Sequence, residues 1–371
     1  QTRLQLKSLF MPKIKRLLSS SEAILEASDQ MMKRDNKLIL IGEGINDPKG
    51  IFGTTSNLFK IYGKDRVIES PISENGITGV SIGLSINGFK VLLIHQRVEF
   101  ALLSLEQIIN NAAKSFYVSN GKHNVPIVIR MVIGRGWGQG PAHSQSLETV
   151  FSSTPGLKVI IPSTPYDAKG MLISSIFDPN PVLILEHRWF HFVKGDVPKR
   201  IYKTNLKKPN VILKGNDITV VASSYNINEV IFCSKILKNF GISIEIIDLR
   251  VLRPLDTEVI FKSVKKTGRL IVFEIGNKIY GVGGEIISMI LEKDFNIFKS
   301  SPSRIGLPDS PTPSSRALAE KYYPNSSDIL KEISKQLNVN VEVQEKIINL
   351  LLDKIPENEI DVPNPEFKGP F

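Results

Sequence analysis

The sequence predicts an α/β protein built from two doubly wound domains. Short runs of branched apolar residues alternate with helix-like segments from about residue 37 to residue 336, which is typical of a mostly parallel sheet covered on both faces. A stretch without clear periodicity interrupts this alternation at residues 191–213, where we expect a linker. The length of 371 residues is sufficient for two domains with well-filled cores.

Composition excludes several classes of protein. Hydrophobic residues make up 42% and charged residues 23%, and no apolar run is long enough to span a bilayer, so we expect no membrane insertion. A single cysteine, Cys233, cannot form an internal disulfide or hold an iron–sulfur cluster, which favours a reducing, cytoplasmic compartment. The net charge of +10 is spread along the chain without a recognition motif, which predicts a solvated basic surface and no nucleic-acid partner.

Residues 1–19 form a basic extension with five basic side chains and no acid. This extension is either the remnant of a transit sequence, which would imply a mitochondrial matrix or plastid location, or a disordered, partner-binding segment. A chain that opens with Gln1 also suggests processing or truncation. Ser19 to Ser21 then lead into a helix that includes Ile24 and Met32.

The first domain is expected at residues 20–190. Its strands are predicted at Lys37–Ile41, Arg66–Ile68, Lys90–Ile94, Pro126–Val132, Leu157–Ile161 and Pro181–Leu185. Its further helices are predicted at Asn57–Tyr62, Asn75–Ile86, Leu102–Tyr117, Ser144–Ser152 and Pro165–Phe177.

The second domain is expected at residues 214–337, followed by a C-terminal tail at 338–371. Its strands are predicted at Asp217–Ala222, Ser243–Asp248 and Arg269–Phe273, and its helices at Asn226–Lys238, Asp256–Lys265, Val282–Leu291 and Ser326–Gln336. In the tail, Glu342–Lys354 is an amphipathic helix, and the Pro-rich end at Asp361–Phe371 cannot form regular structure.

Glu74 occupies a fixed point where an extended run passes into a helix. Ser73 is expected to cap that helix, and Gly79 and Gly83 are expected to let it lie close to a neighbour. From the local pattern alone, Glu74 is either an acid favoured by the helix dipole or a functional carboxylate.

Two glycine-rich stretches, Gly134–Gln145 and Gly281–Glu285, resemble nucleotide-binding loops only weakly. Neither contains a full G-x-G-x-x-G or a P-loop ending, and the glycines of the first more plausibly shape a loop that presents His143. A histidine at a helix start is often structural, so both interpretations of His143 stay open. Because the sequence also lacks H-E-x-x-H, paired-Cys, EF-hand and nucleophile-elbow patterns, metal, hydrolase and redox classes are disfavoured.

Several separate motifs follow one another in order along roughly residues 20–335. They are Pro71–Gly79, Glu106–Lys114, His143–Ser146, Pro155–Val159, Pro162–Gly170, Ile247–Asp256, Lys266–Leu270 and Gly281–Glu285. In this order they resemble the beta subunit of thiamine-diphosphate-dependent 2-oxoacid dehydrogenase E1 components, of the pyruvate, branched-chain and acetoin type within the transketolase-like superfamily.

The resemblance implies a thiamine pyrimidine-binding domain followed by a transketolase C-terminal-type domain. In this family thiamine diphosphate is shared between chains, and an alpha-type partner holds the diphosphate and Mg²⁺ through a Gly-Asp-Gly motif. The present sequence contains no Gly-Asp-Gly. The implied assembly is an α₂β₂ heterotetramer, to which a lipoyl acyltransferase E2 can bind.

The same resemblance implies roles for individual residues. Glu74 matches the glutamate that hydrogen-bonds the pyrimidine nitrogen N1′, Phe100 the aromatic that packs on the pyrimidine, and His143 an active-site histidine that faces the substrate. Asp178 matches a turn at which some relatives bind a structural K⁺. For Phe100, a core position on an amphipathic helix is the alternative.

The chain departs from the family pattern around His95, Arg97 and Arg135. If these side chains reach the cleft, the substrate carries an extra anionic or polar group; alternatively, they line the interface between subunits. Neither the 2-oxoacid nor its acceptor follows from the sequence. A transketolase-like carboligase acting without a lipoyl core and a non-catalytic structural subunit are the alternative functions.

Overall fold

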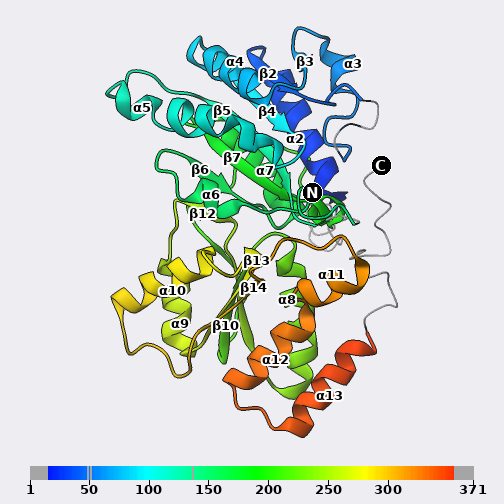
Figure 1. Cartoon of the computed structure of the whole chain (residues 1–371), viewed down its shortest axis with the longest axis vertical. Helices are drawn as coiled ribbons and strands as arrows, with labels where there is room; N and C mark the ends of the chain where they lie inside the picture. The colour runs from blue at the N-terminus through cyan, green and yellow to red at the C-terminus, as the bar shows by residue number, and fades with distance from the viewer. Residues whose placement is uncertain (1–15, 48–49, 51, 136–137, 355–371) are drawn as a thin grey trace, which may run out of the picture.

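The structure, a computed structural model, describes residues 16–47, 50, 52–135 and 138–354. The chain forms two α/β units, each built on a mostly parallel sheet with helices on both faces, so the predicted fold class is confirmed (Figure 1). The expectations for most of the basic extension and for the Pro-rich end concern residues outside the described ranges.

The first unit is organised around a seven-stranded sheet in the order β12-β6-β7-β5-β4-β2-β3. Neighbouring strands are parallel except for β12, which runs antiparallel to β6. The strands are β2 (Leu38–Gly42), β3 (Val67–Glu69), β4 (Lys90–His95), β5 (Ile127–Ile133), β6 (Lys158–Ile160), β7 (Val182–His187) and β12 (Val251–Arg253). Because β12 comes from the second half of the chain, that half contributes an edge strand to the first sheet.

Both faces of this sheet are buried. Leu38 and Leu40 of β2 pack into one hydrophobic core, and Ile39 and Ile41 pack into the core on the other face. This double burial explains why the strands are nearly continuous apolar runs. The covering helices are α2 (Ser20–Arg34), α3 (Leu58–Tyr62), α4 (Glu74–Ile86), α5 (Ser115–Val118), α6 (Glu148–Ser152) and α7 (Pro165–Ile176).

Two predicted helices are shorter or more irregular than expected. The segment expected as one helix at Leu102–Tyr117 is divided into the 3-10 helix η1 (Phe100–Ser104), the π-helix η2 (Gln107–Ala112) and α5. Within η2, the side chain of Asn111 bonds the carboxylate of Glu106 five residues earlier, a spacing that matches the i→i+5 repeat of a π-helix. The helix expected from Ser144 starts only at Glu148, because Leu147 adopts φ 51°, a left-handed conformation.

The second unit contains a five-stranded sheet in the order β14-β13-β10-β11-β9, with only β9 antiparallel. Its strands are β9 (Asn210–Leu213), β10 (Ile218–Ala222), β11 (Ile244–Asp248), β13 (Leu270–Asn277) and β14 (Ser303–Leu307). Its helices are α8 (Asn226–Leu237), η4 (Lys238–Phe240), α9 (Glu258–Thr267), α10 (Val282–Lys293), α11 (Arg316–Tyr322), α12 (Ser326–Gln336) and α13 (Val341–Leu352). The outer strands β9 and β14 were not expected from the sequence.

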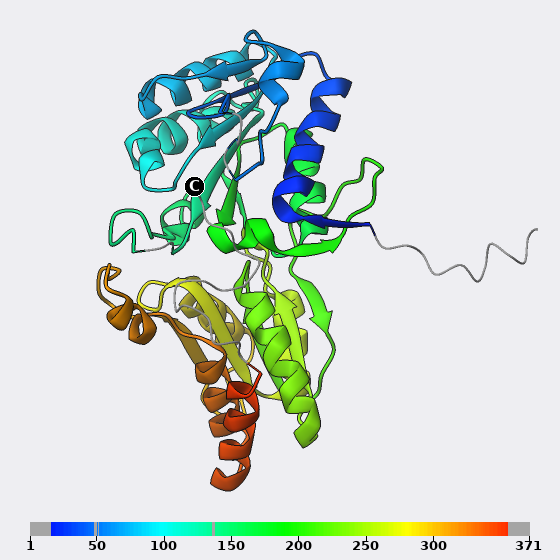
Figure 2. The same ribbon diagram turned by 90° about the vertical axis from the view of Figure 1, so that its right-hand side faces the viewer.

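Helix α13 belongs physically to the second unit. Its residues Ile347 and Leu351 are fully buried in the core formed with α8 and α12, and α13 lies beside α12 (Figure 2). The stretch expected as a linker contains the end of η3 (Arg188–Phe192), the strand β8 (Lys194–Asp196), which pairs with β1 (Leu17–Ser19), and β9. Over the described residues, none of the helices is long and apolar enough to cross a membrane.

Candidate active site

The candidate residues follow the carboxyl ends of five adjacent strands of the first sheet. Glu74 follows β3, Glu43 follows β2, Phe100 follows β4, His143 follows β5 and Arg188 follows β7. In parallel sheets this edge is where ligands bind, because the connecting loops leave crevices there. The fold therefore gathers on one edge residues that are up to 145 positions apart in sequence, between Glu43 and Arg188.

Glu74 is the first residue of α4 and is 5% exposed. Its backbone carbonyl accepts a hydrogen bond of 2.7 Å from Thr78 Oγ1. The expected cap by Ser73 is wrong, because that side chain makes no capping hydrogen bond. Among the described residues, the carboxylate of Glu74 has no hydrogen-bond donor, which fits a group that would receive a donor from a bound molecule.

Glu43 is a second acid beside Glu74 that the sequence reasoning missed. Burial, followed by the charges of Glu74 and Glu69, raises the pKa of the Glu43 carboxyl. Its Oε1 is buried without a hydrogen-bond partner among the described residues, whereas Glu69 accepts from the backbone N–H groups of Gly44 and Asn46 at 2.6 and 3.1 Å. The only sequence signal is the position of Glu43, between two glycines directly after a strand.

His95 supports the turn that carries Glu74. It is 3% exposed, and its Nε2 lies 3.3 Å from Oγ1 of Thr78, the residue that bonds the Glu74 carbonyl. Burial lowers the pKa of His95 to about 4, so the ring is neutral at pH 7. This location suits a positioning role better than the substrate contact expected from the sequence.

His143 is held by Glu99. The Nδ1 of His143 lies 2.7 Å from Oε1 of Glu99, and the histidine side chain is 43% exposed against 9% for the glutamate. The ring of Phe100 meets the His143 ring edge-on, with centroids 5.6 Å apart. The structure thus brings His143 and Phe100 together and adds Glu99, which precedes Phe100 and was not singled out in the sequence.

Arg97 lies beside His143, whereas Arg135 belongs to another group. Arg97 Nη1 contacts Oε1 of Gln139 and lies 3.4 Å from the backbone oxygen of His143. Arg188 Nη1 contacts the same Gln139 oxygen at 2.6 Å. Burial lowers the pKa of both guanidinium groups, to about 10 for Arg188.

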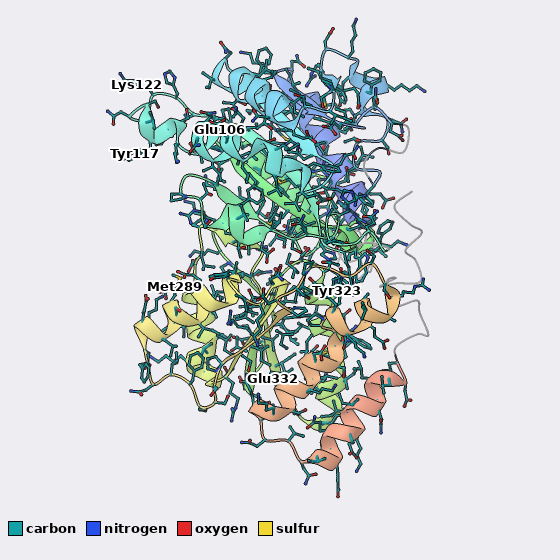
Figure 3. All side chains as sticks on the ribbon, viewed as in Figure 1. Glu106, Tyr117, Lys122, Met289, Tyr323 and Glu332 are labelled. Atoms are coloured by element: carbon teal, nitrogen blue, oxygen red, sulfur yellow. The ribbon has the colours of Figure 1, made fainter. Side chains whose placement is uncertain are left out.

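Arg135 lines a cavity of about 50 Å³ between the two units. Its guanidinium stacks over the Trp189 ring at 3.7 Å and the Tyr323 ring at 4.2 Å. Figure 3 labels Tyr323 near the level where the two units meet. The cavity also contains His187, whose pKa is lowered to about 3 by burial and then by neighbouring cations, Arg135 first among them.

Asp178 is paired with a lysine. Both carboxylate oxygens lie 2.7 Å from Lys158 Nζ, and one also accepts from the backbone N–H of Asn180 at 3.0 Å. A lysine ammonium therefore supplies the positive charge at the position considered for K⁺. Across the described ranges, no group of three or more His, Cys, Asp or Glu side chains could hold a metal ion.

Comparison with known proteins identifies the family. The model of the transketolase pyrimidine-binding domain matches residues 17–189, and that of the transketolase C-terminal domain matches residues 207–329. The pyruvate dehydrogenase E1 component subunit beta of Acholeplasma laidlawii is 38% identical over 320 residues, covering 86% of this chain and 98% of that protein. The acetoin:2,6-dichlorophenolindophenol oxidoreductase subunit beta of Bacillus subtilis is 35% identical, covering 85% and 96%.

Two further comparisons extend the range of relatives. The mitochondrial pyruvate dehydrogenase E1 component subunit beta of Pisum sativum is 35% identical and covers 86% of this chain. A solved structure titled as a split-gene transketolase, inactive beta4 tetramer, has a TM-score of 0.69 at 21% identity over 87% of this chain, and it supports the fold alone. The chain belongs to the family of E1 component beta subunits with transketolase-type pyrimidine-binding and C-terminal domains.

Proposed function

We propose that Glu74 of this chain activates thiamine diphosphate from the pyrimidine side, in an active site completed by an alpha-type subunit. Family membership makes the chain a beta subunit of a thiamine-diphosphate-dependent 2-oxoacid dehydrogenase. The observation that carries the role of Glu74 is its buried carboxylate, which lacks a donor among the described residues and lies at the carboxyl edge of a parallel sheet.

The bound cofactor would supply a carbon nucleophile for the carbonyl carbon of the 2-oxoacid and an electron sink for decarboxylation. Glu74 would share a proton with the pyrimidine ring nitrogen N1′, and Glu43, whose pKa is raised by burial and then by the charge of Glu74, lies beside it. Phe100 would pack against the ring, a contact worth about 1 kcal/mol beyond area burial. His143, oriented by Glu99, would exchange protons with the substrate through its other ring nitrogen.

Exposed apolar side chains support a protein partner. Ile72 is 85% exposed beside the start of α4, and Val80 on that helix is 60% exposed. On the same helix, a Cβ added at Gly83 would meet nothing within 4 Å, so a neighbour could approach closely there. Tyr117 at the projecting α5 is 88% exposed (Figure 3). We infer contacts with an alpha-type subunit in an α₂β₂ heterotetramer.

Other parts of this proposal depend on the family alone. Mg²⁺ would be held by the alpha-type partner, and a lipoyl acyltransferase E2 would accept the product. A cytoplasmic location is proposed, although one relative is named as mitochondrial.

The decisive experiment is Glu74→Gln in the complex reconstituted with its alpha-type partner. We expect the rate of 2-oxoacid decarboxylation to fall by about 10²-fold or more, because glutamine cannot share the pyrimidine proton. Glu292→Gln, at an exposed position of α10, is the matched control and should leave the rate unchanged. An unchanged rate for Glu74→Gln would instead favour a non-catalytic structural subunit.

One relative indicates a second substrate class. It is named as a subunit of an oxidoreductase that acts on acetoin, which is not a 2-oxoacid. Assays of the same complex with pyruvate and with acetoin, each followed by dichlorophenolindophenol reduction, would separate the two. A dehydrogenase would form NADH in a lipoyl-dependent assay, whereas a carboligase would form a ketol when an aldehyde is added.

A further inference from the structure

Arg97 and Arg188 converge on one neutral oxygen next to the active-site histidine. Both guanidinium groups donate to Oε1 of Gln139, and Arg97 also reaches the backbone oxygen of His143. The two arginines come from adjacent parts of the sheet edge, after β4 and after β7, and Gln139 comes from the loop after β5 between them. We call these three side chains the arginine clamp.

The charges of the arginine clamp are not balanced within the described residues. Arg188 is 1% exposed, and its Nε is buried without a hydrogen-bond partner. Glu99 is the acid that acts on both arginines, and it already accepts from His143. Arg188 otherwise lies 5.9 Å from the centre of the Phe52 ring. A buried cation and a half-buried cation that share one acid favour the entry of another anion.

The geometry specifies the chemistry of that anion. Guanidinium groups form their strongest hydrogen bonds with carboxylate and phosphate oxygens, and two groups aimed at one point bind an oxyanion better than an amide. Gln139 is half-buried, so its side chain can withdraw and yield the position of its oxygen. The oxygen of Gln139 therefore marks the position of a ligand oxygen.

The bound group cannot be the carboxylate that the reaction removes. Decarboxylation disperses the negative charge of that carboxylate. Two arginines bound to it would therefore stabilise the substrate more than the transition state, which would slow the reaction. We propose that the arginine clamp binds a second, non-reacting oxyanion of the substrate, a carboxylate or a phosphate. This inference rests on the proposed function, and it makes Arg188 and Gln139 specificity-determining residues for a 2-oxoacid with two oxyanionic groups, termed dianionic whether the second group is a carboxylate or a phosphate.

A purely structural role makes a different prediction. If the two arginines only anchor the loop that carries Gln139, a carboxylate at position 139 would strengthen the anchor and affect all substrates equally. If they bind the substrate, the same carboxylate would occupy the clamp and exclude a second oxyanion. Gln139→Glu therefore separates the two roles, and it preserves the size of a half-buried side chain.

The test uses the complete complex and three 2-oxoacids: pyruvate, 2-oxoglutarate and 3-phosphohydroxypyruvate. For the wild type we expect kcat/KM at least about 10-fold higher for one of the two dianionic substrates than for pyruvate, the scale of one charge-assisted contact. Gln139→Glu should lower kcat/KM for the preferred substrate about 10-fold more than it lowers kcat/KM for pyruvate, and so abolish that preference. Which dianion is preferred identifies the second group as carboxylate or phosphate.

A second readout does not require turnover. Calorimetric titration of the complex prepared without thiamine diphosphate should show the preferred dianion binding about 10-fold more weakly to Gln139→Glu than to the wild type. Equal use of all three substrates by the wild type, or equal losses on all three in the variant, would overturn the inference. Failure to decarboxylate any 2-oxoacid, pyruvate included, would instead overturn the proposed function, and the titration would still decide whether the clamp binds dianions.

Discussion

Nδ1 of His143 lies 2.7 Å from Oε1 of Glu99, so a histidine side chain that is 43% exposed is held by a carboxylate side chain that is 9% exposed. An ionised carboxylate accepts the hydrogen on Nδ1 and leaves the lone pair on Nε2. Nε2 is then free to face a substrate. Glu99 is thus a positioning residue, which acts through His143.

Replacement of Glu99 by glutamine should therefore slow catalysis without emptying the site. A glutamine can donate to Nδ1, which moves the ring hydrogen to Nε2 and removes the proton acceptor. We expect kcat to fall by about 10- to 100-fold, within the range for misoriented acid–base groups, with KM changed by less than threefold. Steady-state kinetics of the reconstituted complex measures this split.

The control for this prediction is Glu99→Asp, which keeps the charge and should restore part of the rate if a carboxylate orients His143. A merely structural role would make Glu99→Asp, which shortens the side chain, at least as slow as Glu99→Gln, which keeps its size. The pH profile of kcat should also change in Glu99→Gln but not in the exposed control Glu292→Gln.

The sequence predicted the sheet residues better than the residues between them. Nearly continuous apolar runs such as Ile127–Ile133, interrupted only by Arg130, and the strand-to-helix transition at Glu74 have local signals, and the ordered motifs pointed to Phe100 and His143. Glu99, Glu43 and Arg188 have no such signal. Nothing in the local sequence distinguishes these three polar residues. They are recognised as site candidates only in the fold, where parallel strands place their three loops on one edge of the sheet.

Irregular segments were missed for the opposite reason, since their local signal was misleading. The apolar period through Leu102–Tyr117 is genuinely helical, yet the segment contains a π-helical stretch whose polar side chains bond one another. The short edge strands β9, β12 and β14 lack a periodic pattern of their own, because they are defined by the strands with which they pair.

The Lys158–Asp178 pair predicts an enzyme that needs no potassium. The lysine ammonium lies 2.7 Å from both oxygens of Asp178, where it supplies the charge that a monovalent cation would otherwise supply. We expect thermal stability and activity to change by less than twofold when KCl is replaced by NaCl at equal ionic strength.

Lys158→Met provides the complementary test of this pair. Without the ammonium, Asp178 retains an uncompensated charge in a site that is 14% exposed, and added K⁺ should raise the melting temperature of the variant more than added Na⁺ does. A wild-type complex that loses activity in NaCl would contradict the assignment of the lysine as the resident cation.

The buried ion pair between Arg130 and Glu186 should be costly to break. These residues lie on the adjacent strands β5 and β7, with Nε–Oε1 at 2.6 Å and Nη2–Oε2 at 2.9 Å, and His191 adds a contact of 2.8 Å. Burial alone would raise the pKa of Glu186, but the charge and hydrogen bonds of Arg130 and His191 lower it to about 2.

Removal of one partner of this ion pair should leave the other as an unpaired buried charge and so destabilise the fold. We expect Glu186→Gln to lower the free energy of unfolding at pH 7 by about 3 kcal/mol or more, because Arg130 then remains charged and buried. Urea denaturation measures the difference. Since the pKa of Glu186 is depressed, its contribution is present above pH 4.5 and lost as the pH falls toward 2, so the two proteins should converge in acid. A constant difference down to pH 2 would contradict this assignment.

The two carboxyls Glu148 and Glu274 should make the contact between the two units depend on pH. Glu148 comes from α6 of the first unit and accepts from the backbone of Gly276 in β13, while Glu274 lies in the same strand and accepts from Gly283 N–H at 3.0 Å. Burial raises the pKa of each to about 7, and the charge of Glu148 contributes to the shift at Glu274, which the cations Arg304 and Lys278 oppose.

Because both pKa values are raised on folding, the folded chain holds protons that the unfolded chain releases between pH 4.5 and about 7. The stability contributed by these groups is therefore complete below pH 4.5 and is lost as the pH rises to about 7, by at most about 1.4 kcal/mol per pH unit for each group. Glu148→Gln, which stays neutral, should flatten this slope. Urea midpoints at pH 5, 6, 7 and 8 give the slope directly, with Glu292→Gln as the exposed control. Parallel curves for the wild type and Glu148→Gln would show that Glu148 is ionised in the folded chain and that the contact between the units is held by an anion instead of a neutral acid.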